Sequence, residues 1–155
     1  MTNSNDIIFA QALDCYVEIE YTNKKLSSIR FVKSGEGLKE RKTQDFTFEL
    51  ERYFQGEKIG FSCGFDISHL SQFTQKVLVE TGKIGYGKTS TYSQLAKNIG
   101  GLGARAVGGA LARNPIPIVI PCHRVVAKNG IGGYSAGVGI KTRLLELEKS
   151  KANNL

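Results

Sequence analysis

The stretch NPIPIVIPCHRVV, residues 114–126, organises the rest of the chain. Its apolar run from Ile116 to Ile120 is typical of a buried strand or extended segment. Pro121 has no N–H to donate, so regular pairing ends directly before Cys122. The sequence therefore predicts a thiol fixed at the end of a rigid segment, which is a suitable place for a reactive atom.

The two residues after this cysteine are basic. His123 and Arg124 add positive potential beside Cys122, and we expect both to favour the thiolate over the thiol. A salt bridge from Arg124 would also hold the segment in place. The alternative interpretation of Cys122 is a small, buried apolar side chain. A proline-rich apolar segment on one side and two cations on the other weigh against that alternative.

The composition is that of an ordinary folded protein. The chain has 155 residues, 41% of them hydrophobic, which suffices for one domain or two small ones. No apolar run approaches the roughly 20 residues that cross a bilayer, and the polar start from Met1 to Asp6 is unlike a secretory signal. Three cysteines without close spacing predict a reduced, cytoplasmic protein.

Charge divides the chain into two unequal parts. Residues 1–67 carry nine Lys and Arg against eleven Asp and Glu, whereas residues 68–155 carry twelve against three. A solvated basic surface would explain this, but a half-chain with a net charge of +9 more often faces a polyanion. We therefore predict two domains, 1–67 and 68–155, with nucleic acid as the partner of the second.

The first part is predicted to be a small α/β scaffold without chemistry of its own. Its expected elements are strands at 7–9, 15–21 and 27–32, a hairpin turn at 23–25, a helix at 44–54 and an extended segment at 58–66. Phe48, Leu50 and Phe54 are the expected apolar residues of the helix. Cys15, Cys63 and His69 do not have a recognisable zinc-binding spacing, and a disulfide between the two cysteines stays open.

The second part is predicted to be helical. Ser71 is the expected cap of a helix that ends near Thr81, and Thr91 or Ser90 caps the next helix. The predicted helices cover residues 71–81, 92–99 and 104–113, with a glycine turn at 100–103. Two short helices joined by such a turn indicate a helix-turn-helix unit, so the fold class is α+β with a winged-helix-like second domain.

The helix that begins at Ala104 has few side chains long enough to reach base edges. Gly108 and Gly109 lie inside it, although each glycine costs about 0.5–1 kcal/mol there relative to alanine. Tight packing against another helix is one explanation, and close approach of the helix backbone to DNA is the other. In the second case, Arg105 would be the one long side chain that enters the base stack.

The end of the chain supplies a loop and a last helix. Five glycines between Gly130 and Gly139 indicate a backbone that passes close to a ligand, and a flat base fits this loop better than a phosphate. The helix, predicted at 139–149, places Glu148 on its apolar face by helical periodicity. A buried carboxylate needs a partner, and His123 is the expected one, although a surface position for Glu148 stays possible.

Several motifs together resemble those of the O6-alkylguanine-DNA alkyltransferases. The resemblance extends from Phe73 to about Glu148, roughly half of the chain. It is carried by YSQLA at 92–96, ARAVGGA at 104–110, NP at 114–115, PCHRV at 121–125 and YS at 134–135.

The resemblance implies direct repair of DNA by a protein that acts once, as a monomer, without metal or organic cofactor and without a membrane partner. A thiolate takes the alkyl group from O6 of an extruded guanine, and O4 of thymine is a second possible donor. The implied reacting residues are Cys122, His123, Glu148 and Asn114. The implied DNA contacts are Arg105, Tyr92, Ala104, Gly108 and Arg113, and the implied base pocket is Val125, Ile131, Tyr134 and Ser135.

Within this scheme, Glu148 orients His123, and His123 takes the proton of Cys122 through a water. Arg105 fills the gap left by the extruded base, and Asn114 ties the DNA-binding helix to the active site. Two other functions stay open. A cysteine hydrolase would release its product and ignore duplex DNA, and a lesion sensor would bind damage without the cysteine, which is present here.

Overall fold

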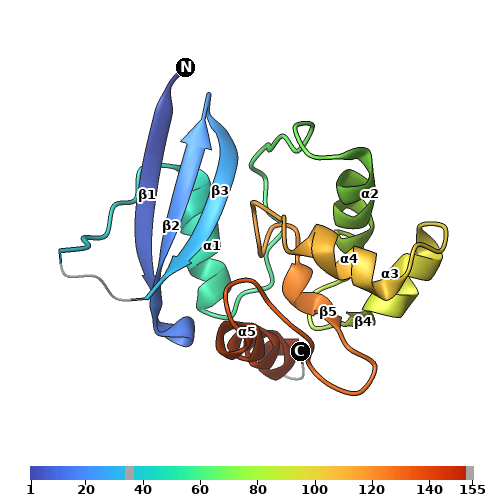
Figure 1. The fold of residues 1–155 in the computed structure, drawn as a ribbon. Helices are drawn as coiled ribbons and strands as arrows, with labels where there is room; N and C mark the ends of the chain where they lie inside the picture. Colours follow the sequence, from blue (N-terminus) through green and yellow to red (C-terminus); the bar gives the residue numbers. More distant parts are fainter. Residues whose placement is uncertain (34–36, 153–155) are drawn as a thin grey trace.

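The computed structural model describes residues 1–33 and 37–152 (Figure 1). A three-stranded sheet, a short 3-10 helix and one α-helix make up the first part, and helices dominate the second, as the α+β prediction requires. The strands are β1 (Asn3–Ala10), β2 (Cys15–Thr22), β3 (Lys25–Val32), β4 (Ser90–Thr91) and β5 (Val125–Val126). The helices are η1 (Gln11–Leu13), α1 (Asp45–Phe54), α2 (Gln72–Thr81), α3 (Tyr92–Asn98), α4 (Ala104–Leu111), η2 (Cys122–Arg124) and α5 (Val138–Ala152).

The sheet is an antiparallel meander in the order β1-β2-β3. Strand β2 alternates buried and partly exposed residues along its whole length, which is the period-2 pattern of a sheet with one covered face. Asn23 and Lys24 both have positive φ values, 51° and 65°, as a tight two-residue hairpin requires. The three predicted strands and their turn are confirmed, and β1 begins four residues earlier than predicted.

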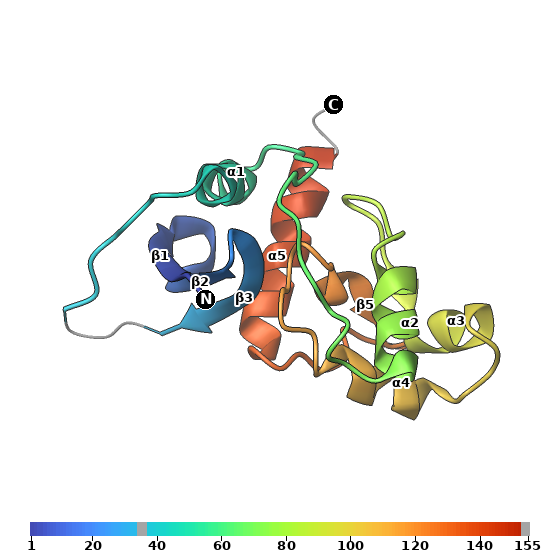
Figure 2. The ribbon, with the colours of Figure 1, turned by 90° about the horizontal axis from the view of Figure 1, so that it is seen from above.

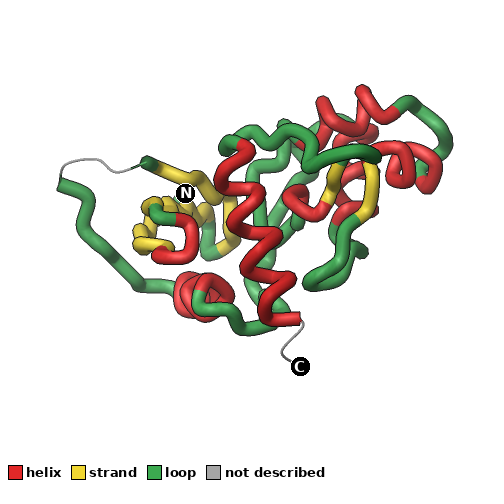
Figure 3. The backbone as a smooth tube through the Cα atoms, turned by 90° about the horizontal axis from the view of Figure 1, so that it is seen from below, coloured by secondary structure: helices red, strands yellow, loops and turns green. Residues whose placement is uncertain are grey.

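Helix α1 covers one face of this sheet and buries Phe46, Thr47, Leu50, Tyr53 and Phe54. Phe48, another of the expected apolar residues of this helix, lies outside the core with 48% of its surface exposed. Helix α5 runs between the sheet and the remaining helices, as two opposite views show (Figures 2 and 3). The last helix therefore connects the two parts of the molecule, and the division at residue 67 stays a prediction.

The second part contains the predicted helix pair. The Ser71 hydroxyl accepts a hydrogen bond from the Thr74 N–H, and the Thr91 hydroxyl accepts one from Gln94, so both predicted N-caps are confirmed. Helices α3 and α4 pack on each other and are joined by residues 99–103. Helix α4 ends at Leu111, two residues before the predicted end.

The apolar run before the reactive cysteine folds differently from the prediction. Ile116, Ile118 and Ile120 are buried, but residues 116–120 form a tight turn in which the Ile120 N–H donates to the Ile116 carbonyl oxygen at 3.1 Å. Ile118 has a φ of 76°, a rare backbone conformation for a β-branched residue. Cys122 then begins the short 3-10 helix η2 instead of ending a strand, because three prolines keep this segment out of a sheet.

The structure also bears on the cysteines and on membrane-spanning helices. Cys15, Cys63 and Cys122 are all free thiols, so Cys15 and Cys63 do not pair. Among the helices of residues 1–33 and 37–152, none is long and apolar enough to cross a membrane.

Candidate active site

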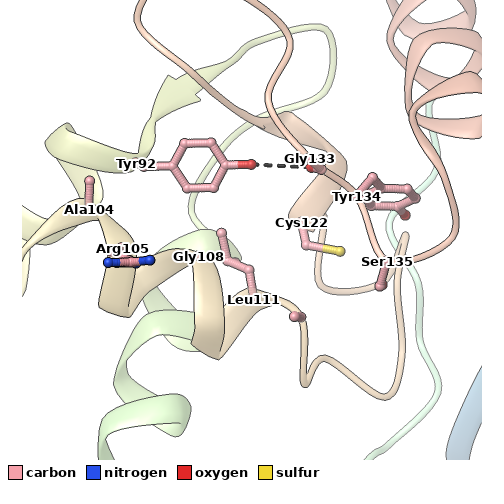
Figure 4. A pocket seen from close by; sticks show the side chains of 10 residues that line it. Tyr92, Ala104, Arg105, Gly108, Leu111, Cys122, Gly133, Tyr134 and Ser135 are labelled. Carbon is pink, nitrogen blue, oxygen red and sulfur yellow. Dashed lines mark hydrogen bonds between the residues drawn. The ribbon is translucent and has the colours of Figure 1, made fainter.

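One cavity of about 490 Å³ lies between α3, α4, η2 and the loop before α5 (Figure 4). It unites residues that the sequence analysis predicted separately as DNA contacts, reacting group and base pocket. The cavity is lined by Tyr92, Ala104, Arg105, Gly108, Leu111, Ala112, Cys122, Gly133, Tyr134 and Ser135. The sulfur atom of Cys122 points toward the side of the cavity formed by Tyr134 and Ser135.

Three structural devices bring these side chains together. Strands β4 and β5 pair in parallel, Ser90 with Val125 and Thr91 with Val126, and so join the start of α3 to the end of η2. The Tyr92 hydroxyl donates to the Gly133 carbonyl oxygen at 3.2 Å. Gly132, with a φ of 77°, lies so close to the Tyr92 ring that a Cβ there would be 2.8 Å from it. The glycine-rich loop is therefore held against α3.

The two glycines of α4 do not serve close packing within the protein. A Cβ added to Gly109 would meet no atom within 4 Å, and one added to Gly108 would be 3.9 Å from the Tyr92 ring, an ordinary contact. The described residues therefore give no steric reason for either glycine. Of the two explanations from the sequence, this observation favours close approach of a ligand to the helix surface.

Cys122 lines the cavity although only 6% of its surface is exposed. Burial raises the pKa of its thiol above the usual value, and the nearby side chains of Asn114 and Tyr134 only partly oppose this effect. The sequence-based expectation that His123 and Arg124 favour the thiolate is therefore wrong for this arrangement. Both of those side chains bond to Glu148 instead of the sulfur, so Cys122 rests as a thiol and needs a base.

His123 and Glu148 form the predicted pair. The Nε2 atom of His123 lies 2.8 Å from Oε2 of Glu148, and the two side chains are 0% and 1% exposed. Burial raises the pKa of Glu148, but hydrogen bonds from His123 and Arg124 outweigh it and lower the value to about 2. Burial lowers the pKa of His123, although the bond to Glu148 opposes this. At neutral pH the pair is thus a neutral imidazole beside a carboxylate.

The hydrogen bond to Glu148 decides which ring nitrogen of His123 carries the proton. An ionised carboxylate only accepts hydrogen bonds, so Nε2 must be the donor and Nδ1 has a free lone pair. Nδ1 is buried and has no hydrogen-bond partner among the described residues. The imidazole is therefore oriented as a base with its accepting nitrogen available.

Arg124 holds the same carboxylate with two nitrogens. Its Nε donates to Oε1 of Glu148 at 2.8 Å and its Nη2 to Oε2 at 3.0 Å, while Nη1 donates to the Ile84 carbonyl oxygen at 2.7 Å. The salt bridge expected from the sequence is confirmed. Because guanidinium and carboxylate meet in this forked geometry, η2 and α5 are joined rigidly.

Asn114 clamps the turn that precedes the cysteine. Its Nδ2 donates to the Ile120 carbonyl oxygen at 2.8 Å, and its Oδ1 accepts from the Ile116 N–H at 3.1 Å. Since Asn114 lies three residues after the end of α4 and its N–H donates to the Leu111 carbonyl oxygen, this clamp connects the helix to Cys122, as predicted.

Three predicted residues lie away from the cavity wall. Val125 is fully buried, and neither Ile131 nor Arg113 lines the cavity, whereas Leu111, Ala112 and Gly133 do. Their assignment to the pocket or to DNA stays a prediction.

The sequence analysis missed Lys141, which lies fully buried on α5. Its Nζ donates to the carbonyl oxygens of Val125 at 2.6 Å and Gly133 at 3.0 Å, and to the Tyr92 hydroxyl at 3.3 Å. Burial lowers the pKa of this ammonium group. A signal was present, because Lys141 stands seven residues before Glu148 and therefore on the same helix face.

Comparison with known proteins agrees with this geometry. A family model described as "6-O-methylguanine DNA methyltransferase, DNA binding domain" matches residues 72–150. The methylated-DNA–protein-cysteine methyltransferase of Sulfolobus acidocaldarius is 40% identical over 104 residues, which are 67% of this chain and 66% of that protein. The protein of the same name from Saccharolobus solfataricus is 47% identical over 107 residues, 69% of this chain and 70% of its own length.

A solved structure extends the similarity to nearly the whole chain. A crystal structure of the Mycobacterium tuberculosis OGT in complex with DNA has a TM-score of 0.79 and 33% identity, and the alignment covers 95% of this chain and 93% of that one. The chain therefore belongs to the 6-O-methylguanine DNA methyltransferase family and is a methyltransferase of DNA repair.

Proposed function

We propose that this chain transfers an alkyl group from O6 of guanine in duplex DNA to the sulfur of Cys122, once per molecule. The observation that best supports this proposal is the position of Cys122 in a base-sized cavity, whose opposite wall is the glycine-containing surface of α4. The names and the DNA complex of the relatives support the substrate class.

The reaction is one displacement. His123 takes the thiol proton through a bridging water, and the sulfur forms a bond to the alkyl carbon as the carbon–O6 bond breaks. The electron pair of that bond returns to the base, which takes up a proton from water, and the imidazolium of His123 releases its proton to water, so protons balance overall. Water does not release an alkyl group from a thioether on a useful timescale, so the protein is consumed.

The wall residues support this reaction in distinct ways. Arg105, exposed at the start of α4, fills the space of an extruded base, and the open surface at Gly108 lets the helix backbone approach the DNA. Tyr134 and Ser135 contact the base beside Cys122, and the Ser135 hydroxyl donates to the departing oxygen. Alkylated O4 of thymine is a second candidate donor for the same sulfur.

Mass spectrometry of the protein after incubation with methylated duplex DNA tests the proposal. We expect a gain of one methylene on the peptide that contains Cys122, saturating at one per protein. Cys122→Ala should lose transfer and keep DNA binding that weakens with salt, as phosphate contacts require. Repeated turnover would indicate a hydrolase, and methyl transfer by Cys122→Ala would refute the assigned acceptor.

A further inference from the structure

The first part of the chain, predicted to be a scaffold, contributes a side chain to the buried acid–base cluster. Tyr53 on α1 is 1% exposed, and its hydroxyl donates a short hydrogen bond to Oε2 of Glu148. The same hydroxyl lies 3.5 Å from Nε2 of His123. It therefore meets the pair at the atoms through which imidazole and carboxylate interact.

The two carboxylate oxygens of Glu148 have different numbers of hydrogen-bond donors around them. Oε2 lies within hydrogen-bond distance of three donors, which are His123 Nε2 at 2.8 Å, Arg124 Nη2 at 3.0 Å and the Tyr53 hydroxyl. Oε1 accepts from Arg124 Nε at 2.8 Å and from the Gly87 N–H at 3.4 Å. A carboxylate oxygen has two lone-pair sites, so three donors on Oε2 compete for its negative charge.

Tyr53 keeps its proton throughout the working pH range. Burial raises the pKa of this phenol well above its ordinary value, and the charge of Glu148 raises it further. Tyr53 is therefore a constant donor and not a member of the proton relay.

We propose that Tyr53 is a positioning residue whose hydroxyl shares Oε2 of Glu148 with His123. By competing for this oxygen, Tyr53 limits the strength of the hydrogen bond that Nε2–H of His123 donates to the carboxylate. Without the hydroxyl, the carboxylate would interact more strongly with His123 and stabilise its protonated form. The imidazole would then be a stronger base, but it would already be protonated at higher pH. Tyr53 thus keeps His123 neutral and ready to accept a proton. This inference rests on the proposed role of His123 as the base.

Other charged and titratable groups also surround His123, and Tyr53→Phe alters none of them. Glu148 and Lys141 on α5 and Arg124 on η2 act on His123 directly. Cys122 precedes His123 in the chain, and Tyr86, in the loop before β4, acts on Glu148 and Arg124.

The chain offers a direct measurement, because it contains only two histidines, His69 and His123. His69 is exposed and serves as an internal reference for NMR titration of imidazole signals. In Tyr53→Phe we expect the His123 titration to move to higher pH. Tyr86→Phe is the matched control, because the buried Tyr86 hydroxyl has no hydrogen-bond partner among the described residues and its ring lies 6.2 Å from that of Tyr53.

Single-turnover methyl transfer as a function of pH gives the second readout. In Tyr53→Phe the acidic limb should shift upward, and a shift of about half a unit to one unit is a roughly three- to tenfold loss of rate at a fixed pH on that limb. The rate on the plateau at higher pH should not fall. A residue that only supports packing would lower the rate by the same factor at every pH.

A third variant has the opposite expected sign. Replacing Tyr53 by 3-fluorotyrosine keeps the ring in place and makes the hydroxyl a stronger donor, so the His123 titration should move to lower pH. This variant also keeps the test decisive if Tyr53→Phe does not fold. An unchanged His123 titration in the fluorinated protein or in folded Tyr53→Phe would overturn the inference, whereas absence of methyl transfer in the unmodified protein would instead overturn the proposed function.

Discussion

Two buried carboxylates, Asp6 in the sheet and Glu148 in the last helix, have nearly the same exposure but different surroundings. Asp6 is 0% exposed and Glu148 1%. Asp6 accepts hydrogen bonds from neutral groups, the N–H groups of Thr43 and Gln44 and the hydroxyls of Thr43 and Thr47. Glu148 instead accepts from a histidine, an arginine and a tyrosine, and these connect it to the cysteine cavity.

The difference teaches how to separate a structural acid from a functional one. Burial raises the pKa of Asp6, but bonds from Thr47 and Thr43 outweigh it, so the net pKa is lowered. That carboxylate ties β1 to the start of α1. Glu148 also has a lowered pKa, but one of its partners, His123, is an imidazole that can accept a proton from another group. Burial and a shifted pKa are common to both, so the partners decide the function.

The largest expected effect is on the rate of transfer in Glu148→Gln. A neutral amide can accept from Nε2–H or donate to a bare Nε2, so it neither fixes the required tautomer of His123 nor supplies a negative charge. We therefore expect a loss of roughly 10²-fold or more, the usual contribution of an oriented base. Single-turnover methyl transfer measures it. Asp6→Asn is the matched control, because the same exchange at the structural acid should leave the rate of folded protein within about twofold. Equal losses in both variants would remove the distinction between the two acids.

Asp6→Asn should have its effect on stability instead. The NH2 group of asparagine is a donor, and it would face the N–H and O–H donors that now bind the Asp6 carboxylate. We therefore expect the free energy of unfolding to fall by roughly 2–3 kcal/mol. Urea unfolding followed by circular dichroism measures it. Thr43→Val, which removes only one of the hydroxyl donors, should cost less; a larger loss in that variant would show that Asp6 does not organise the contact.

Acid should destabilise the cluster of His123 and Glu148 in two separate pH ranges. His123 has a lowered folded pKa, so the folded state binds fewer protons and stability begins to fall below the unfolded value of about 6.5. Glu148, whose unfolded value is 4.5, loses its contribution between about 4.5 and 2. Urea unfolding at several pH values measures this, and Asp6→Asn should keep the upper range. A flat stability between pH 7 and 5 would contradict the assigned neutral imidazole.

The contrast also shows what sequence can predict. Helical periodicity from Ile140 to Glu148 predicted that Glu148 lies on the buried face of the last helix, because the pattern is contained in one element. A buried carboxylate needs a partner, and His123 was the expected one. The caps Ser71 and Thr91 were equally local and were confirmed.

What the sequence did not predict depends on distant contacts. Asp6 stands in a strand with apolar residues on both faces, and its partners begin 37 residues later, so no local pattern indicates that it is buried. Tyr53 and Glu148 are 95 residues apart. The thiol of Cys122 was expected to be ionised from adjacent charges, but sequence neighbours in a 3-10 helix point elsewhere, and burial dominates.

The smallest expected effect separates a local cap from a remote one. Ser71 caps α2 locally, because its hydroxyl accepts from the Thr74 N–H and donates to the Thr74 hydroxyl, three residues away. Asp6 instead accepts four hydrogen bonds at the start of α1 from its position in strand β1. We therefore expect Ser71→Ala to cost about 1 kcal/mol, less than Asp6→Asn. Urea unfolding of both variants compares them, with Ser71→Asp, which keeps a cap, as the control. A larger loss of stability in Ser71→Ala than in Asp6→Asn would contradict this comparison. It would show that the buried Asp6 carboxylate stabilises the start of α1 less than the Ser71 cap stabilises the start of α2.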